Sequence, residues 1–299
     1  MQKIIVDDSN NERIDMYLMQ HTEFTRNKIQ RLIKNSDITV NDIKVKNSYI
    51  VKDNDVILIK DLVPEIMEAK AEKMSLDIIY EDEDVIVVNK ANGIVVHPAI
   101  GNNSGTLVNG LLYHAKSLSN INGSFRPGIV HRIDAYTTGL LMVAKNDYAH
   151  EQLASQLAVK KTTRKYWALV WGVINHDTGT IDAPIGRDTT DRKKMAVTDI
   201  NSKDAITHFR VIERYKDATL IELSLETGRT HQIRVHMQYI GYPIVNDPVY
   251  GRRKLIDNSG QCLHAKTLGF IHPRTNKYME FDSELPECFT NILNKFKNS

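Results

Sequence analysis

Hydrophobic and polar positions divide the first 60 residues into two short helices followed by strands. A helix is predicted from Arg13 to Leu18, where Ile14 and Leu18 lie one turn apart. A second helix is predicted over residues 26–34, with Thr25 as its N-cap and one apolar face. Alternating residues then predict strands over 38–40, 43–45 and 55–59, the first two joined by the hairpin-type pair Asn41-Asp42.

From about residue 75 the pattern is that of a larger mixed domain. Strands are predicted over 85–90, 140–144, 166–171 and 218–225. A helix over 147–159 has Asn146 as its cap, and another begins after Thr230 and ends at Gly241. These signals alternate irregularly, so the predicted fold class is α+β. We expect a small α/β module at 1–62, a linker at 63–74 and a larger domain at 75–299.

Composition fits this organisation and narrows the class of protein. The 299 residues suit two domains of about 150 residues each. Hydrophobic residues make up 41% and charged residues 25%, as in globular proteins. Two cysteines argue against a disulfide framework and favour a reducing, cytoplasmic location. Because no apolar run approaches the roughly 18 residues of a membrane span, we expect no membrane partner.

Basic residues form three local groups, although the formal net charge is only +2. The polar face of the second helix contributes the first group. Each group alone is typical of a solvated surface, but three on a nearly neutral chain indicate a track for a polyanion such as RNA. The groups are Arg26, Lys28, Arg31 and Lys34; Lys160, Lys161, Arg164 and Lys165; and Arg187, Arg192, Lys193 and Lys194.

The segment from Pro127 to Lys145 carries the strongest chemical signal. It places Asp134 on a polar loop between two apolar strands, directly after His131 and Arg132. A reactive side chain on a loop mounted on rigid strands is a common arrangement in enzymes. A loop aspartate beside an arginine is nevertheless more often a turn or salt-bridge residue, so the pattern alone leaves both interpretations open.

Several familiar kinds of site do not fit the sequence. The segment 131–134 lacks the spacing of a kinase catalytic loop, and no phosphate-binding glycine motif is present. His231 and His236 would lie roughly 140° apart on a helix and could not share a metal ion. Arg229 lies between a strand end and a helix start, where a solvated arginine is the more common case. We therefore expect no cofactor and no metal.

Five segments carry recognisable motifs: His-Arg-Ile-Asp within 131–141, Lys-Tyr-Trp-Ala-Leu-Val at 165–170, Thr-Gly-Arg-Thr-His within 226–236, and the segments 92–98 and 263–265. Together they resemble the motifs of RNA pseudouridine synthases of the ribosomal large-subunit (RluA/RluD-like) type, over nearly the whole chain. Segment 131–141 is similar to that family's catalytic His-Arg-Leu-Asp loop, with Ile133 and Thr138 in place of Leu and Ser, and segment 165–170 is similar to its Lys-x-Tyr-x-Ala-Leu-Val element. Residues 13–59 resemble a small RNA-binding module first seen in a ribosomal small-subunit protein (S4-like), with Asn35-Ser36-Asp37 where Gly is usual.

The resemblance implies a mixed, mainly antiparallel catalytic sheet and an isomerase that converts uridine in structured RNA to pseudouridine. By resemblance Asp134 is the essential carboxylate, acting as a nucleophile or as a base at the sugar. Arg229 pairs with Asp134, and an adjacent cation favours an ionised carboxylate. Tyr166 stacks on the uracil and helps to remove the C5 proton. RNA contacts are expected from the first basic group and from His131, Arg132, Arg192, Lys193, Lys194 and His231.

Other functions stay open from the sequence. A non-enzymatic RNA-binding factor on the same scaffold would be expected to lack Asp134, Tyr166 or Arg229, yet all three are present. An aspartate-nucleophile hydrolase would need a metal or a second acid nearby. Large-subunit ribosomal RNA is the expected partner, with transfer RNA as the alternative. We expect a monomer.

Overall fold

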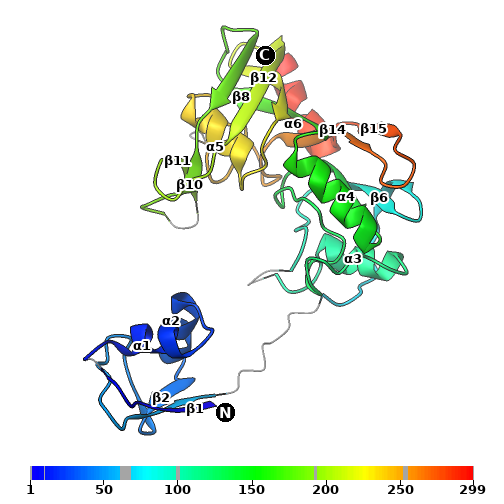
Figure 1. Ribbon diagram of the computed structural model, residues 1–299. Helices are drawn as coiled ribbons and strands as arrows, with labels where there is room; N and C mark the ends of the chain where they lie inside the picture. The colour runs from blue at the N-terminus through cyan, green and yellow to red at the C-terminus, as the bar shows by residue number, and fades with distance from the viewer. Residues whose placement is uncertain are drawn as a thin grey trace. The chain divides into compact units, whose positions relative to one another are not determined.

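The computed structural model describes residues 2–9, 11–60, 69–98, 102–191, 194–251 and 255–298 (Figure 1). The chain divides into a small unit, Met1–Ile66, and a large unit, Met67–Ser299. The division falls within the predicted linker, of which residues 63–68 lie outside the described residues. Residues 69–74 form neither helix nor strand. No described helix is long and apolar enough to cross a membrane.

The small unit packs two helices on an antiparallel sheet with strand order β1-β4-β2-β3. The turn between β2 and β3 has positive φ at both Asn41 and Asp42, as the sequence predicted for a hairpin pair. After α2, the left-handed residue is Ser36, which replaces the usual glycine. The elements are β1 (Gln2–Ile5), α1 (Ile14–His21), α2 (Arg26–Lys34), β2 (Ile38–Val40), β3 (Ile43–Lys44) and β4 (Val56–Ile59).

A buried carboxylate joins the two helices of the small unit. The Asp15 side chain is completely buried and accepts hydrogen bonds from Arg13, Arg26 and Gln30. Burial raises the pKa of Asp15, but these hydrogen bonds and the charge of Arg13 lower it by more, so the carboxyl is ionised. At the start of α2, Arg26 therefore uses one of its hydrogen-bond donors, Nε, for Asp15.

The large unit is built on a nine-stranded sheet with order β5-β6-β7-β14-β8-β13-β12-β9, and β15 pairs with β14. Among the described strands, only β7 and β14 pair in parallel, which confirms the expected mainly antiparallel sheet. Strands β10 and β11 form a separate hairpin. The strands are β5 (Asp77–Glu81), β6 (Val85–Lys90), β7 (Thr138–Ala144), β8 (Thr163–Trp171), β9 (Thr178–Asp182), β10 (Ile185–Arg187), β11 (Met195–Val197), β12 (Ile206–Arg214), β13 (Ala218–Leu225), β14 (Leu263–Ile271) and β15 (Tyr278–Asp282).

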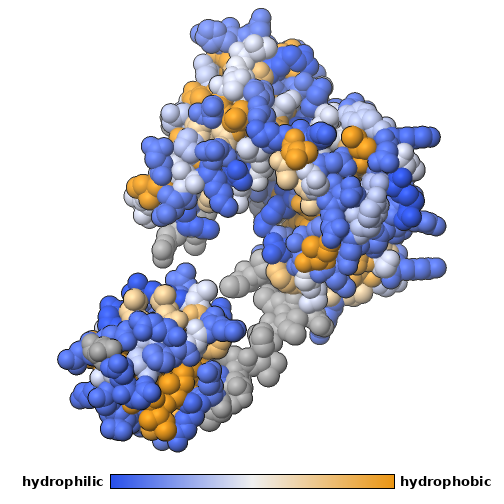
Figure 2. Space-filling view, viewed as in Figure 1, coloured by the Kyte–Doolittle hydropathy of each residue, from blue (hydrophilic) through white to orange (hydrophobic). Residues whose placement is uncertain are grey.

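The described residues of the large unit form four helices: α3 (Leu107–His114), α4 (Asp147–Ala158), α5 (Gln232–Tyr239) and α6 (Glu287–Lys297). Asn146 caps α4 by accepting a hydrogen bond from the Ala149 amide, as predicted. Every residue of β7 is buried, because the central strand is covered on both faces. On the face seen in Figure 2, each unit exposes mainly hydrophilic residues, and small hydrophobic patches are scattered among these residues.

The parallel contact between β7 and β14 fixes the start of β7. His264 pairs with Thr138, and Ala265 pairs with Gly139. Gly139 has a φ of 106°, and a Cβ there would overlap the Ala265 carbonyl oxygen. Only glycine combines this backbone conformation with so close an approach. The loop that carries Asp134 therefore enters the sheet at a rigid point.

Candidate active site

A cavity of about 460 Å³ opens in the large unit, within the size range of small-ligand pockets. Its walls come from the loop 130–137, the end of α4, the start of β8, the segment 225–234 and Leu263 of β14. Asp134, Tyr166, Arg229 and His231, which lie far apart in the sequence, all line it. The fold thus brings together four of the residues predicted to act on or contact the substrate.

The loop around Asp134 is held by a buried lysine at the end of β6. The Lys90 ammonium group donates to the carbonyls of Ala91 and Ala135, 2.9 and 2.8 Å away. Burial lowers the pKa of Lys90 to about 7, and the negative charge of Asp134 opposes that shift. The Thr137 amide also donates to the Asp134 carbonyl. The backbone on both sides of Asp134 is therefore fixed, while its side chain stays 20% exposed to the cavity.

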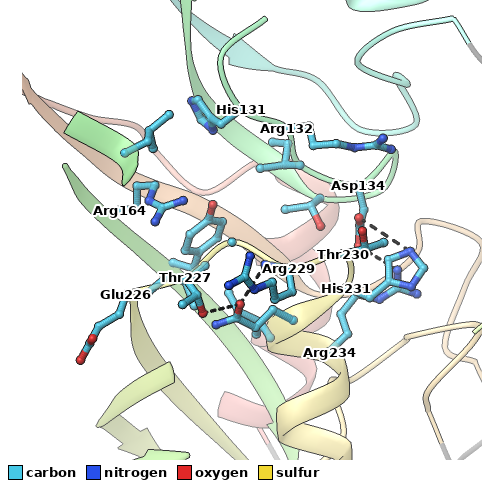
Figure 3. Close-up of a pocket in the computed structure, with 18 of the residues that line it drawn as sticks. His131, Arg132, Asp134, Arg164, Glu226, Thr227, Arg229, Thr230, His231 and Arg234 are labelled. Atoms are coloured by element: carbon cyan, nitrogen blue, oxygen red, sulfur yellow. Dashed lines mark hydrogen bonds and ion pairs between the residues drawn. The ribbon is translucent and has the colours of Figure 1, made fainter. Parts of the chain in front are cut away.

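Arg234 of α5 is the arginine that contacts Asp134. Its Nη1 donates to Asp134 Oδ2 at 2.9 Å (Figure 3). Its Nε and Nη2 donate to the two oxygens of Asp247, at 2.7 and 2.9 Å. Asp247 is completely buried and also accepts from the amides of Val249 and Tyr250. The guanidinium is therefore held from one side by Asp247 and presents its free edge to Asp134.

The charges of this group stabilise one another. Burial lowers the pKa of Arg234, but the hydrogen bonds and charges of Asp247 and Asp134 raise it by more. Burial raises the pKa of Asp247, and Arg234 lowers it by more. Arg234 thus stays a permanent cation against Asp134, and Asp247 stays an anion behind it.

The predicted pairing of Arg229 with Asp134 is wrong. Arg229 Nε donates to the Asp204 carbonyl at 2.8 Å, and no described contact joins its guanidinium to Asp134. Gln232 accepts from the Arg229 amide, and the N-cap of α5 is His231, in a left-handed conformation, rather than the predicted Thr230. This turn points Arg229 to the cavity wall and Arg234, in the first turn of α5, to Asp134. The sequence placed both arginines in one motif but could not show the turn that separates them.

Tyr166 lies on β8 with its side chain almost fully buried. Strand β8 pairs with β13 and β14, so that Leu223 and Ala265 flank Tyr166 in the sheet. Burial raises the pKa of Tyr166, with the charge of Asp134 adding to the increase and Arg164 opposing it. The neutral phenol is therefore the resting form, at a rigid position in the cavity wall.

His131 and Arg132 both line the cavity, but their bonding differs. His131 Nε2 accepts a hydrogen bond from the Met142 amide, and burial together with Arg164 lowers the pKa of His131 to about 3. Arg132 Nη1 donates to His97 Nε2 at 3.3 Å, and burial with two nearby arginines lowers the pKa of His97 to about 4. His131 thus anchors the loop to β7 as a neutral ring, while Arg132 lines the cavity with one guanidinium nitrogen bonded to His97.

The predicted basic groups are only partly described. Lys28, Arg31 and Lys34 lie on α2 of the small unit beside Arg26. Arg192 and Lys193 lie outside the described residues, whereas Lys194 lies 4.0 Å from Asp191. Among the residues that the structure describes, no group of three or more His, Cys, Asp or Glu side chains could hold a metal ion.

The sequence reasoning missed Lys90, Asp247 and Arg234 as members of this site. A weak signal exists for Lys90, which ends an otherwise apolar strand. Arg234 lies next to the apolar helix position Ile233, and that proximity could have suggested burial. Nothing local marks Asp247, because its role depends on α5 packing against the following loop.

Known proteins resemble the chain over most of its length. A family model described as RNA pseudouridylate synthase matches residues 84–239, and an S4 domain model matches residues 12–57. An uncharacterized RNA pseudouridine synthase of Bacillus subtilis is 53% identical over 98% of this chain and 97% of its own length. The ribosomal large subunit pseudouridine synthase D of Zymomonas mobilis is 44% identical, covering 89% of this chain and 87% of that protein.

A solved structure shows the same fold. The human RNA pseudouridylate synthase domain containing 1 superimposes with a TM-score of 0.58 and 25% sequence identity, over 75% of this chain and 96% of that one. The family model, the relatives and the solved structure all point to one family. The chain therefore belongs to the RNA pseudouridylate synthase family, isomerases that convert uridine in RNA to pseudouridine, and carries an S4 domain at its N-terminus.

Proposed function

We propose that this enzyme isomerises uridines of large-subunit ribosomal RNA, with Asp134 as the essential carboxylate. The observation that carries the assignment of Asp134 is its position: a partly exposed carboxylate in the cavity, with one oxygen bonded to the buried cation Arg234. The proposed RNA class rests on relatives named ribosomal large subunit pseudouridine synthase D, at 43–44% identity over most of the chain.

The reaction needs two groups from the protein, one anion and one proton acceptor. The N1–C1′ bond of uridine breaks, the uracil rotates, and a C5–C1′ bond forms. The C5 proton then leaves, and N1 regains a proton, so the product is an isomer of the substrate. Asp134 acts at the sugar, as a nucleophile or as a base, and either role needs an ionised and oriented oxygen. Arg234 supplies both conditions without leaving its bond to Asp247.

The cavity accepts a nucleoside that has left its base stack. Extruding a base costs a few kcal/mol, which contacts in the pocket must offset. Tyr166 provides an aromatic surface for the uracil, and we assign the C5 proton to its phenol oxygen, which gives its own proton to N1 and so ends neutral as it began. Arg132 and Arg229 lie in the cavity wall and contact the RNA. The basic face of α2 supplies sequence-independent attraction for the phosphate backbone.

Tritium release tests the role of Asp134. Asp134→Asn should release no tritium from ribosomal RNA labelled at C5 of uridine, while it still binds that RNA. Asp199→Asn, which changes an exposed carboxylate of the same unit, is the matched control and should behave as wild type. Release at the wild-type rate by Asp134→Asn would remove Asp134 from the mechanism.

The RNA class has its own test. Carbodiimide mapping of pseudouridines in RNA from a strain without the gene, against its parent, should show sites lost from the large-subunit RNA. Loss confined to transfer RNA would contradict the proposed substrate and leave the role of Asp134 intact.

A further inference from the structure

The two oxygens of the Asp134 carboxylate face different neighbours. Oδ2 accepts the hydrogen bond from Arg234, and Oδ1 lies 3.8 Å from His231 Nε2 (Figure 3). An aspartate held through one oxygen can still rotate about its side-chain bonds. A second contact on Oδ1 would decide which lone pair faces the substrate.

His231 is held in place by Tyr250. Its Nδ1 lies 2.7 Å from the Tyr250 hydroxyl, and the two rings meet edge to face, with centroids 5.5 Å apart. Tyr250 is almost completely buried, and its ring also packs 4.9 Å from the Arg234 guanidinium carbon. The left-handed backbone of His231, with φ at 58°, turns the ring toward both partners.

The hydrogen-bond network assigns the proton on His231. The Met195 amide donates to the Tyr250 oxygen at 2.9 Å. The Tyr250 hydroxyl then uses its own proton for His231 Nδ1, which makes Nδ1 the acceptor. The remaining ring proton is on Nε2, facing Asp134. Burial lowers the pKa of His231, with Arg234 and Arg132 adding to the decrease and Asp134 and Asp247 opposing it, so the ring is neutral and its Nε2–H is a donor aimed at Asp134.

The other end of this network is the β10–β11 hairpin. Met195 is the first residue of β11 and pairs with Arg187 of β10. Met195 and Val197 pack with Tyr250 and Val235 of α5 in one small apolar cluster. Lys194, which was predicted to contact RNA, directly precedes Met195. The position of the hairpin thus sets the position of the Tyr250 hydroxyl.

We propose that His231 is a positioning residue that fixes the rotation of the Asp134 carboxylate, and that Tyr250 transmits to it the position of the β10–β11 hairpin. The proposal rests on the proposed role of Asp134. The 3.8 Å separation is longer than a hydrogen bond, as is common in an active site without substrate. RNA that binds against the hairpin shortens the separation between His231 Nε2 and Asp134 Oδ1. Asp134 is therefore oriented only when the substrate is present.

Two substitutions test the relay with little disturbance of the fold. Tyr250→Phe removes the hydroxyl and keeps the buried ring. His231→Asn removes the imidazole and keeps a residue that tolerates left-handed backbone. Each should lower kcat about 10- to 100-fold with KM for RNA unchanged, because misplacing a reacting group costs rate rather than binding. Tyr80→Phe, which removes a hydroxyl bonded to Asp82, is the matched control and should leave both constants unchanged.

The double variant decides whether the two residues act together. If Tyr250 acts through His231, the double variant should be no slower than His231→Asn alone. Multiplied losses would overturn the relay. A raised KM with unchanged kcat for His231→Asn would make His231 an RNA contact only and would also overturn it.

Nitrogen NMR of the labelled full-length enzyme gives a readout that does not depend on uridine chemistry. The His231 ring should show the Nε2-protonated tautomer, and Tyr250→Phe should shift it toward a mixture. The Nδ1-protonated tautomer in the wild type would contradict the relay even if Asp134 is essential. The expected tautomer together with a fully active Asp134→Asn would instead contradict the proposed function.

Discussion

Arg234 contacts Asp134 at the cavity and Asp247 in the interior at the same time. The three hydrogen bonds, of 2.7 to 2.9 Å, use both edges of the guanidinium. A lysine could hold one carboxylate but could not reproduce this fork, because an ammonium group is a point charge. The planar shape of Arg234 thus links the functional carboxylate to the core of the fold.

Arg234 and Arg229 should therefore differ in their effects on catalysis. We expect Arg234→Lys to lower kcat about 100- to 1000-fold, as loss of a preorganised electrostatic contact does. Arg229→Ala should mainly raise KM for RNA, since its described bonds go to Asp204 and Gln232. Steady-state tritium release would measure both. An inactive Arg229→Ala beside an active Arg234→Lys would contradict this assignment.

Removal of the buried partner of Arg234 should cost stability. Asp247→Ala leaves the buried Arg234 guanidinium with Asp134 as its remaining carboxylate partner. We expect the free energy of unfolding of the large unit to fall by about 3–5 kcal/mol. The control is Asp177→Ala, which breaks the exposed pair with Arg214 and should cost about 1 kcal/mol or less. Urea unfolding would measure both. Equal losses would show that burial of the pair is unimportant.

Gly139 should be intolerant of any side chain. Gly139→Ala adds positive-φ strain and a clash with the Ala265 carbonyl, so we expect a loss of about 2 kcal/mol or more in unfolding free energy. Gly93→Ala is the matched control, because Gly93 also has positive φ but nothing lies within 4 Å of the added Cβ. Thermal unfolding of the two variants isolates the close approach of β7 and β14. Similar losses in the two variants would mean that the positive φ alone, and not the contact with Ala265, explains the loss of stability.

The basic face of α2 should contribute to RNA binding through charge alone. Lys28→Ala, Arg31→Ala and Lys34→Ala should each reduce the slope of log affinity against log salt by about 1. Arg26→Ala should have a smaller effect, because Arg26 is bonded to Asp15. Lys297→Ala on α6 serves as a control. Binding measured at four salt concentrations tests this, and an unchanged slope in all four α2 variants would remove the helix from the RNA interface.

A buried histidine of the large unit should make its stability depend on pH. His264 lies between the hydroxyls of Thr138 and Ser283, each 2.8 Å away, and burial lowers its pKa to about 4. The unfolded chain, with a histidine pKa near 6.5, binds more protons between pH 6.5 and 4. The contribution of the neutral His264 ring to the free energy of unfolding is thus complete above pH 6.5. It is lost as the pH falls from 6.5 towards 4, at up to about 1.4 kcal/mol per pH unit.

His264→Gln provides the comparison, because the buried neutral rings of His97 and His131 are present in both proteins. Urea unfolding from pH 7.5 to 5 should show a steeper loss for the wild type than for the variant. Parallel curves would mean that His264 does not titrate between the folded and unfolded states.

Much of the fold was accessible from local patterns. Strands 85–90 and 218–225 were predicted with the ends that the structure shows, and α4 was predicted to within a residue with its Asn146 cap. These segments combine strong periodicity with clear start or stop residues. Strands β14 and β15 and helix α6 were not predicted, because their residues carry mixed patterns that only packing resolves.

The sequence by itself determined the family, the chain order of the two units and several of the residues around the cavity, Asp134 and Tyr166 among them. Those properties reside in residue types at fixed spacings, which a motif preserves. Only the tertiary structure decided that Arg234, rather than Arg229, meets Asp134, and that Asp247 and Tyr250 support the site. The physical reason is that a single left-handed residue, His231, changes the direction of the chain between the two arginines, and buried partners from distant segments then fix the outcome.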